Sequence, residues 1–169
     1  LIRNADGTFT FKYIEWEDRQ AGDLQSVPFP SFEGDYIQYA FFFRNRLGFL
    51  TTSNVIMSRT GEFFNFFRET ATDLLATDPI DVSASHTSVV QFRNAAPHNQ
   101  TLMLNADQTQ FVLNAGDILS PKSVSIDPTT DYVIRRKVAP VTAGPNVYFA
   151  SEAGSFSAIM EYYVEEGAV

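Results

Sequence analysis

Short apolar runs separated by polar turns recur three times along the chain. In the first copy, residues 47–51 and 55–58 flank Thr52, Ser53 and Asn54, a polar group typical of a β-hairpin. The second and third copies have the same form, residues 101–104 with 109–113 and residues 147–150 with 156–160. A hairpin repeated at roughly 40 to 50 residues is typical of β-propeller blades. The pattern therefore predicts an all-β fold, a partial β-propeller of antiparallel blades with hairpin repeats and little helix.

These runs are continuously apolar and do not alternate with polar residues. A strand with one face in water alternates apolar and polar side chains, whereas a strand buried on both faces does not. Four runs contain three consecutive apolar residues: 55–57, 102–104, 111–113 and 147–149. We therefore predict strands covered on both faces, as in a propeller blade between its two neighbours. A large two-sheet sandwich with irregular patterning is the alternative.

Composition excludes several classes of function. The 169 residues are 44 % hydrophobic and 14 % aromatic, which is enough for a core, and the chain has no cysteine for disulfides or zinc ligation. The net charge is −8, and only Arg135, Arg136 and Lys137 form a basic run, so no nucleic-acid-binding footprint is expected. No apolar stretch has the length of a membrane-spanning helix. The chain begins without methionine, and we expect a fragment of a longer protein.

The first 38 residues differ from the rest in their turn-rich composition. We expect residues 1–38 to be a loop-rich segment with one or two strands, one of them at residues 8–13. Its large rings, Trp16, Phe29 and Phe32, are expected to pack this segment onto the propeller. Residues 39–169 then form about three blade-like repeats.

The segment after the first hairpin permits two interpretations. Its apolar residues between 62 and 76 fit a strand, but they also fall at helical spacing. We favour a strand to Phe67 and a short helical turn at residues 70–76, which Asp78 and Pro79 end. Further strands are predicted at residues 80–85, 89–93, 123–126 and 132–138, with a turn at Asp127 and Pro128.

Candidate catalytic and metal-binding residues are few. Asp78 and Asp81 could act as paired carboxylates, but side chains three apart on a strand point to opposite faces, so Asp78 is better explained as a turn residue. His86 and His98 lack the spacing of metal ligands; His86 is predicted in a loop or at a strand end, and His98 in a loop. No phosphate loop, dinucleotide fingerprint or nucleophile elbow occurs. We predict no catalytic, cofactor-binding or metal-binding residue.

Arg44, Asn45 and Arg46 interrupt the most apolar part of the chain. Charged residues in such a stretch must reach solvent, pair with carboxylates or meet another chain. The structural interpretation is a turn whose arginines pair with nearby acids. The functional interpretation makes these three residues candidates for a contact between subunits.

Several blocks of the sequence resemble one known family, tail tubular protein B, the nozzle protein of short-tailed bacteriophages. The blocks follow one another in family order through most of the chain. They are WEDRQAGD at residues 16–23, PSFEG at 30–34, all of residues 41–67, DPIDV at 78–82, DQTQFVL at 107–113 and LSPKSV at 119–124.

The resemblance implies a structural role in the virion. A family member is expected to contain a β-propeller and to assemble with copies of itself into a ring, typically hexameric, at the distal end of the tail. Its expected partners are the tail tube adaptor protein and the tail fibres, and DNA is expected to pass through without specific binding. The family supplies no catalytic residues, and its members are several times longer than this chain. An acidic wall, poor in Lys and Arg, would let DNA slide.

Two other classes of function stay open at this point. Abundant aromatics could stack on sugars, so a carbohydrate-binding or cell-wall- or capsule-degrading tail propeller is the alternative. A host-derived scaffold propeller would share the folding pattern.

Overall fold

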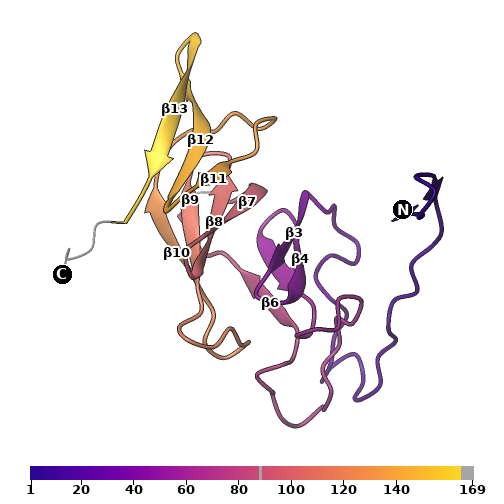
Figure 1. The fold of residues 1–169 in the computed structure, drawn as a ribbon. Coiled ribbons are helices and arrows are strands. Elements are labelled where there is room, and N and C mark those ends of the chain that lie inside the picture. The colour runs from indigo at the N-terminus through magenta and orange to yellow at the C-terminus, as the bar shows by residue number, and fades with distance from the viewer. Residues whose placement is uncertain (88, 165–169) are drawn as a thin grey trace.

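The computed structural model describes residues 1–87 and 89–164, and this part of the chain is built from β-strands without a helix. The prediction of an all-β fold is confirmed. Three larger antiparallel sheets follow one another along the chain after a small two-stranded sheet (Figure 1). The small sheet has β1 (Ile2–Arg3) and β2 (Phe9–Thr10); the first sheet has β3 (Tyr39–Phe43), β4 (Arg46–Leu50), β5 (Asn54–Met57) and β6 (Ile80–Ser83); the second has β7 (Phe92–His98), β8 (Thr101–Ala106), β9 (Gln110–Asn114) and β10 (Ser125–Thr130); the third has β11 (Val141–Ala143), β12 (Asn146–Ala153) and β13 (Phe156–Tyr162).

Each sheet is a meander, because its strands lie side by side in the order in which they occur in the chain. The three predicted hairpins are present as β4–β5, β8–β9 and β12–β13. The first strands of the sheets lie near one another, since β7 contacts both β3 and β11. A four-stranded antiparallel meander is the unit of a propeller blade. Closure of these sheets into a propeller stays a prediction.

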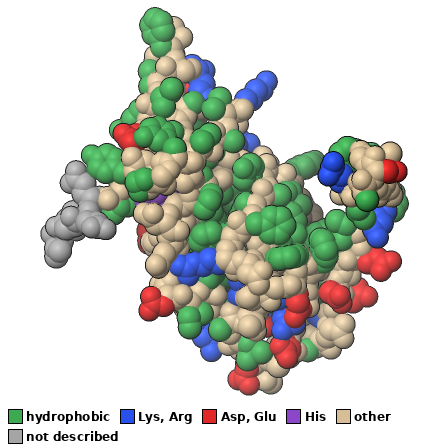
Figure 2. All heavy atoms as spheres, viewed as in Figure 1, with side chains coloured by type: hydrophobic (Ala, Val, Ile, Leu, Met, Phe, Trp, Pro, Cys, Tyr) green, Lys and Arg blue, Asp and Glu red, His purple; other side chains and the backbone are tan. Residues whose placement is uncertain are grey.

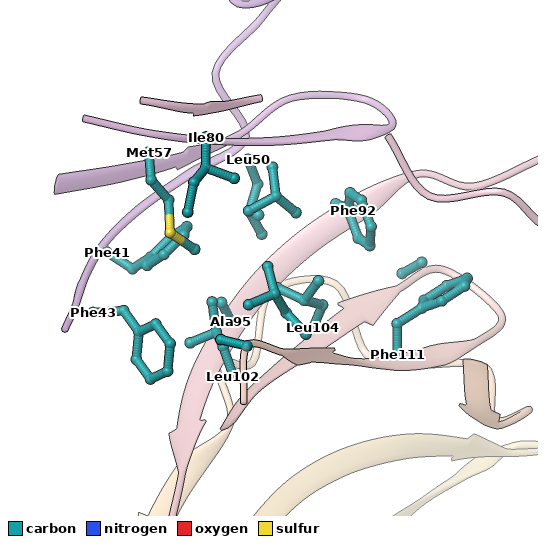
Figure 3. Close-up of a cluster of buried hydrophobic side chains, with 14 of the residues drawn as sticks. Phe41, Phe43, Leu50, Met57, Ile80, Phe92, Ala95, Leu102, Leu104 and Phe111 are labelled. Carbon is teal, nitrogen blue, oxygen red and sulfur yellow. The ribbon is translucent and has the colours of Figure 1, made fainter. Parts of the chain in front are cut away.

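The middle strands of the second sheet, β8 and β9, are covered on both faces. Leu102 and Leu104 of β8 face the first sheet, where they join a buried cluster with Leu50 and Met57 (Figure 3). Met103, between them, faces the other way and packs in a separate cluster with Val147 of the third sheet. All of these side chains are fully buried. The consecutive apolar residues of this strand therefore serve two different interfaces, as predicted.

The middle strands of the first sheet, β4 and β5, are also covered on both faces, but only one cover is another sheet. Val55 and Met57 face the second sheet, whereas Ile56 faces the opposite way and packs with Phe49 and Phe66. Phe66 belongs to the loop that follows β5, outside any strand. Loops carrying large aromatic rings thus take the place that a neighbouring sheet takes elsewhere.

Trp16 fixes the N-terminal segment to this aromatic cluster. Its ring centroid lies 6.2 Å from that of Phe49, 5.8 Å from Phe66 and 6.3 Å from Phe32. Packing through Trp16 and Phe32 is as predicted, while Phe29 is half exposed and contacts Phe67 instead. The small sheet of β1 and β2 lies apart from the three larger sheets and its side chains are exposed (Figure 1).

The third sheet does not follow the prediction of two buried faces. Val147 and Phe149 of β12 are buried, but Tyr148 between them is only partly covered. Along β12 the burial alternates, which is the pattern of a sheet with one open face. The prediction for residues 147–149 was therefore wrong. Its cause is visible in the packing: the second sheet covers one face of β12, and none of the described residues forms a sheet on the other.

Residues 62–76 form neither the predicted strand nor the predicted helical turn. The side chain of Asp78 explains the loop. Its carboxylate accepts hydrogen bonds from the backbone amides of Glu69, at 3.1 Å, and Leu75, at 2.8 Å. Those two amides are then no longer available for a helix, and the segment folds back on itself around a buried carboxylate.

Two C-terminal predictions are also corrected. Asp127 and Pro128 lie within β10 and not in a turn. Proline is tolerated there because β10 is the edge of its sheet, and the register shifts just after Pro128. Residues 132–138 form no strand, although Ile134 makes an isolated bridge to Ser151.

Strand boundaries differ at several more places. The strand predicted at residues 8–13 is limited to β2, and the one predicted at 80–85 ends with β6 at Ser83. The strand predicted at residues 89–93 overlaps only the start of β7. Hydrophobic content marks where strands lie, but the pairing register decides where they begin and end.

Gly48 allows the ring of Phe41 to lie across the first sheet. These residues are partners in the β3–β4 register, and a Cβ atom at position 48 would overlap with the ring. We expect Gly48→Ala to lower the free energy of unfolding by about 1 to 3 kcal/mol, the usual cost of overpacking. Urea denaturation measures this loss. The double variant Phe41→Leu with Gly48→Ala should recover part of it, and a loss unchanged by Phe41→Leu would contradict the steric explanation.

Candidate functional site

Arg44 and Asn45 form the two-residue turn between β3 and β4. Their φ angles are 45° and 60°, in the left-handed region. Two successive residues with positive φ are typical of the tight hairpin turns that match the twist of the flanking strands. The prediction of a turn at this place is confirmed. Arg46 is the first residue of β4.

Arg46 is a buried cation held by backbone carbonyl groups. Only 1 % of the residue is exposed. Its guanidinium donates to the carbonyl oxygens of Ser58 and Asp78, both at 2.7 Å, and of Ala76 at 2.8 Å. Longer bonds reach the carbonyls of Thr77 and Leu119. Burial lowers the pKa of Arg46, and the charge of Asp78 opposes this effect.

These bonds join three distant parts of the chain. Ser58 follows β5, residues 76–78 precede β6, and Leu119 lies in the loop between β9 and β10 of the second sheet. The planar guanidinium has five N–H donors and can serve several carbonyls at once. Arg46 therefore connects the first sheet to a loop of the second.

Arg44 makes a similar connection nearer the surface. Its guanidinium donates to the carbonyl oxygens of Gln100, at 2.8 Å, and Gly116, at 3.1 Å. Both acceptors lie in connections between strands of the second sheet. The interpretation that these arginines pair with acids is corrected, because both guanidinium groups bond to carbonyls. Asn45 is exposed. A subunit contact by Arg44, Asn45 and Arg46 stays a prediction.

Asp78 and Asp81 have separate partners and opposite surroundings. Asp78 is fully buried, whereas Asp81 is exposed. Asp81 accepts a hydrogen bond of 2.8 Å from the backbone amide of Ser31 and one of 3.1 Å from the side-chain amide of Asn54. The prediction that the two carboxylates point to different faces agrees with these contacts. Each carboxylate is a structural hydrogen-bond acceptor.

A second polar network, which the sequence did not reveal, surrounds Asp107. Its carboxylate accepts bonds of 2.6 and 2.9 Å from Arg93 of β7 and one of 2.8 Å from Arg136. The hydrogen bond from Arg93 holds the pKa of Asp107 below its ordinary value of 3.8. The network joins the second sheet to the loop before β11, and Arg136 belongs to the basic run noted above.

Replacing Asp107 with asparagine should destabilise the protein in a pH-dependent way. A depressed carboxylate pKa contributes stability that is present above the unfolded pKa of about 3.8 and is lost as the pH falls through the lower, folded value. We expect a loss of about 1 to 2 kcal/mol at pH 7, low in the range for charged hydrogen bonds because Arg136 is largely exposed. Urea denaturation of both proteins from pH 7 to pH 3 should show the difference shrinking below pH 4. A difference in stability between the two proteins that stays constant over this pH range would contradict a lowered pKa of Asp107 in the fold.

The two histidines lie in different places. His98 is the last residue of β7, is 2 % exposed and has its ring 5.1 Å from that of Tyr162, so it is buried in a strand and not in a loop as predicted. The ring of His86 lies 5.6 Å from that of Phe111. Within residues 1–87 and 89–164, no three His, Asp or Glu side chains gather as a metal site. The same residues include no helix long and apolar enough to span a membrane.

The fold and these contacts define an all-β protein of packed antiparallel meanders. Polar side chains such as Arg46 bond one sheet to the next. A model of the bacteriophage nozzle protein family matches residues 1–168, and the chain belongs to that family. The tail tubular protein gp12 of Escherichia phage T7 is 44 % identical over 163 residues, which are 96 % of this chain and 20 % of that protein. The chain thus spans a fifth of the length of this relative. The resemblance seen in the sequence is confirmed.

Proposed function

We propose that this chain is part of the wall of a phage tail nozzle and that its role is mechanical. Family membership is the observation that carries the proposal. The packing supports it, because the middle strands of the second sheet are buried on both faces and Arg44 and Arg46 tie this sheet to the first. Interiors packed in this way have low compressibility and transmit force. A wall that surrounds DNA under pressure needs that property.

In this proposal residues 39–169 are three consecutive blades of a β-propeller, and residues 1–38 are a loop-rich segment packed beside them. The meander order of the three sheets supports the blade assignment. The contacts of β7 with both β3 and β11 support it further, because they bring the first strands of successive sheets together.

We further propose that the parent protein forms a ring of identical subunits in the virion, six in number as in the resemblance, in contact with the tail tube adaptor protein and the tail fibres. Arg44 and Asn45 are our candidates for the subunit contact, since their turn reaches the surface. Arg46 supports that turn from inside the fold. The net charge of −8 favours passage of DNA without specific binding, because few cations are present to pair with phosphates.

The proposed role includes no catalysis, cofactor or metal. Asp78 and Asp81 bind different backbone and side-chain groups, so they are not arranged as a catalytic pair. Some of the aromatic rings that motivated a carbohydrate-binding alternative pack on one another: Trp16 contacts Phe32, Phe49, Phe64 and Phe66. These contacts favour a structural role for the rings.

Electron microscopy of intact phage particles tests the proposal. The density at the tail tip should contain a ring into which the first and second sheets fit at each subunit. Purified parent protein should form a closed oligomer, measured by mass photometry. Particles with these sheets placed elsewhere in the virion, or a parent protein that stays monomeric at high concentration, would overturn it.

A further inference from the structure

Among the described residues, the third sheet has one strand fewer than the first and second sheets. The first and second sheets each have four strands in chain order, whereas the third has β11, β12 and β13. The position of the first strand is occupied, because β11 and the bridge at Ile134 lie along the edge of β12 that faces away from β13. The fourth position, beside β13, is the one that no described strand occupies.

Along that edge, backbone groups of β13 have no bonding partner among the described residues. The amide of Arg135 donates to the carbonyl of Ala150, and the amide of Glu152 donates to the carbonyl of Val133. The backbone N–H and C=O groups of Ala150 and Glu152 in β12 therefore point away from β13. In an antiparallel pair such positions alternate with those that bond to the partner strand. Ala150 and Glu152 pair with Ile159 and Ser157. The N–H and C=O groups of Ser157 and Ile159, and of Glu161 by the same alternation, therefore point outward.

The other two fourth strands carry features that protect a natural sheet edge, and β13 carries fewer of them: its one charged residue, Glu161, accepts hydrogen bonds from Asn146 and Tyr148 of β12. β6 is short and presents the exposed Asp81, while β10 contains Pro128 and a register shift. By contrast, β13 has seven residues in unbroken register with β12. Its exposed residues include Phe156, 76 % accessible, and Ile159, 81 % accessible. A long, regular, apolar edge of this kind is a template for a further strand.

Apolar side chains also lie around this edge. Val164, just after β13, is 61 % exposed. Figure 2 shows hydrophobic side chains on the surface of the projecting third sheet. Such a surface fits a strand that hydrogen-bonds to β13 and adds apolar side chains beside those already there.

We propose that the edge of β13 binds a β-strand of the same polypeptide, from outside these 169 residues, which pairs antiparallel and completes a four-stranded sheet. Two observations select this occupant. In both complete sheets the fourth strand follows the third along the chain, after the connections at residues 58–79 and 115–124. The T7 relative is about five times longer than the matched region, so polypeptide is available in such a protein. The proposal rests on the blade repeat and not on the location of the protein in the tail.

Site-resolved hydrogen exchange on the full-length parent protein tests the proposal. The amides of Ala158 and Met160 bond to β12 and are protected in either case. With the edge occupied, the amides of Ser157, Ile159 and Glu161 should exchange as slowly as these, to within about tenfold. If the three outward amides exchange at the rate of an unstructured peptide while Ala158 and Met160 are protected, the proposal is wrong.

The same measurement distinguishes the source of the strand. It is made on diluted monomer and on the assembled oligomer. Protection of the outward amides in the monomer supports a strand from the same polypeptide. Protection only in the oligomer means that a second copy supplies the strand, and this outcome overturns the proposal while leaving the ring intact.

A pair of variants gives an independent test in the full-length protein. Ile159→Pro removes the outward amide, and Ile159→Ala removes the side chain but keeps the amide. A free edge tolerates proline, as β10 does with Pro128, whereas a paired edge loses a ladder bond. We expect Ile159→Pro to raise exchange at Ser157 and Glu161 at least tenfold over Ile159→Ala. Equal exchange in the two variants would show that the Ile159 amide has no partner.

Discussion

Replacing Arg46 with methionine is expected to lower the free energy of unfolding by about 3 to 5 kcal/mol. Methionine retains a long apolar side chain but cannot donate to the carbonyl groups of Ser58, Ala76 and Asp78. A buried polar group left without a partner costs about 1 to 3 kcal/mol, and several carbonyls lose their donor together. Urea denaturation followed by the fluorescence of Trp16, the single tryptophan, measures the change.

Two further variants separate the effect of the hydrogen bonds from that of the charge. Arg46→Lys keeps the charge but offers a single nitrogen, which cannot reach all the carbonyls that two guanidinium nitrogens serve, so it should recover less than half of the loss. Arg44→Met removes a partly exposed arginine with fewer carbonyl partners and should cost about 1 kcal/mol. If the methionine variants at positions 44 and 46 are equally stable, Arg46 does not have the role described here.

The buried position of Arg46 also explains why its partners could not be read from the sequence. The surrounding apolar residues indicated that the charge needed compensation, and carboxylates were the natural expectation. Its partners are backbone carbonyls, which every residue has, so no residue type marks them. For the same reason the sequence did not reveal that Asp78 binds the amides of Glu69 and Leu75. Hydrogen bonds from side chain to backbone leave little trace in a sequence.

The parts of the fold that could be predicted are those in which residues close together in the sequence share one structural role, such as burial in a strand. Three successive apolar residues, as at 102–104, indicate burial on both faces, because successive side chains on a strand point in opposite directions. That inference holds where another element covers each face. It fails at Tyr148, because the sequence of one strand does not indicate whether another element packs on each of its faces. The hairpins were predictable because their turn residues lie between the two strands.

Residues 62–76 show the opposite case. Their phenylalanines are used for packing between elements: Phe66 packs on Phe49 and Trp16, and Phe63 contacts Phe42. Spacing that suits contacts with several partners has no single period, so both a strand and a helix fitted it equally well. Tertiary contacts and the Asp78 carboxylate decide the conformation of this loop.

Replacing Phe111 with alanine is expected to lower the free energy of unfolding by about 3 to 5 kcal/mol, as for other large rings deleted from a core. Phe111 of β9 is fully buried on the face of the second sheet that meets the first. Its ring centroid lies 5.7 Å from that of Phe92, and the two rings are nearly perpendicular. The measurement is again urea denaturation, with the slope against urea compared between variants.

The location of Trp16 makes this experiment a test of how the sheets cooperate. Trp16 reports on the aromatic cluster behind the first sheet, whereas Phe111 lies in the second, so the fluorescence transition shifts only if the two sheets unfold together. We expect that shift, with an unchanged slope, because Leu50, Met57 and Leu104 belong to the same buried cluster as Phe111. Phe11→Ala, at a ring that is 83 % exposed, is the matched control and should change stability by less than about 0.5 kcal/mol. A Trp16 transition that does not move in Phe111→Ala, while the amides of β8 and β9 lose protection, would show that the sheets fold as separate units and that no shared core joins them.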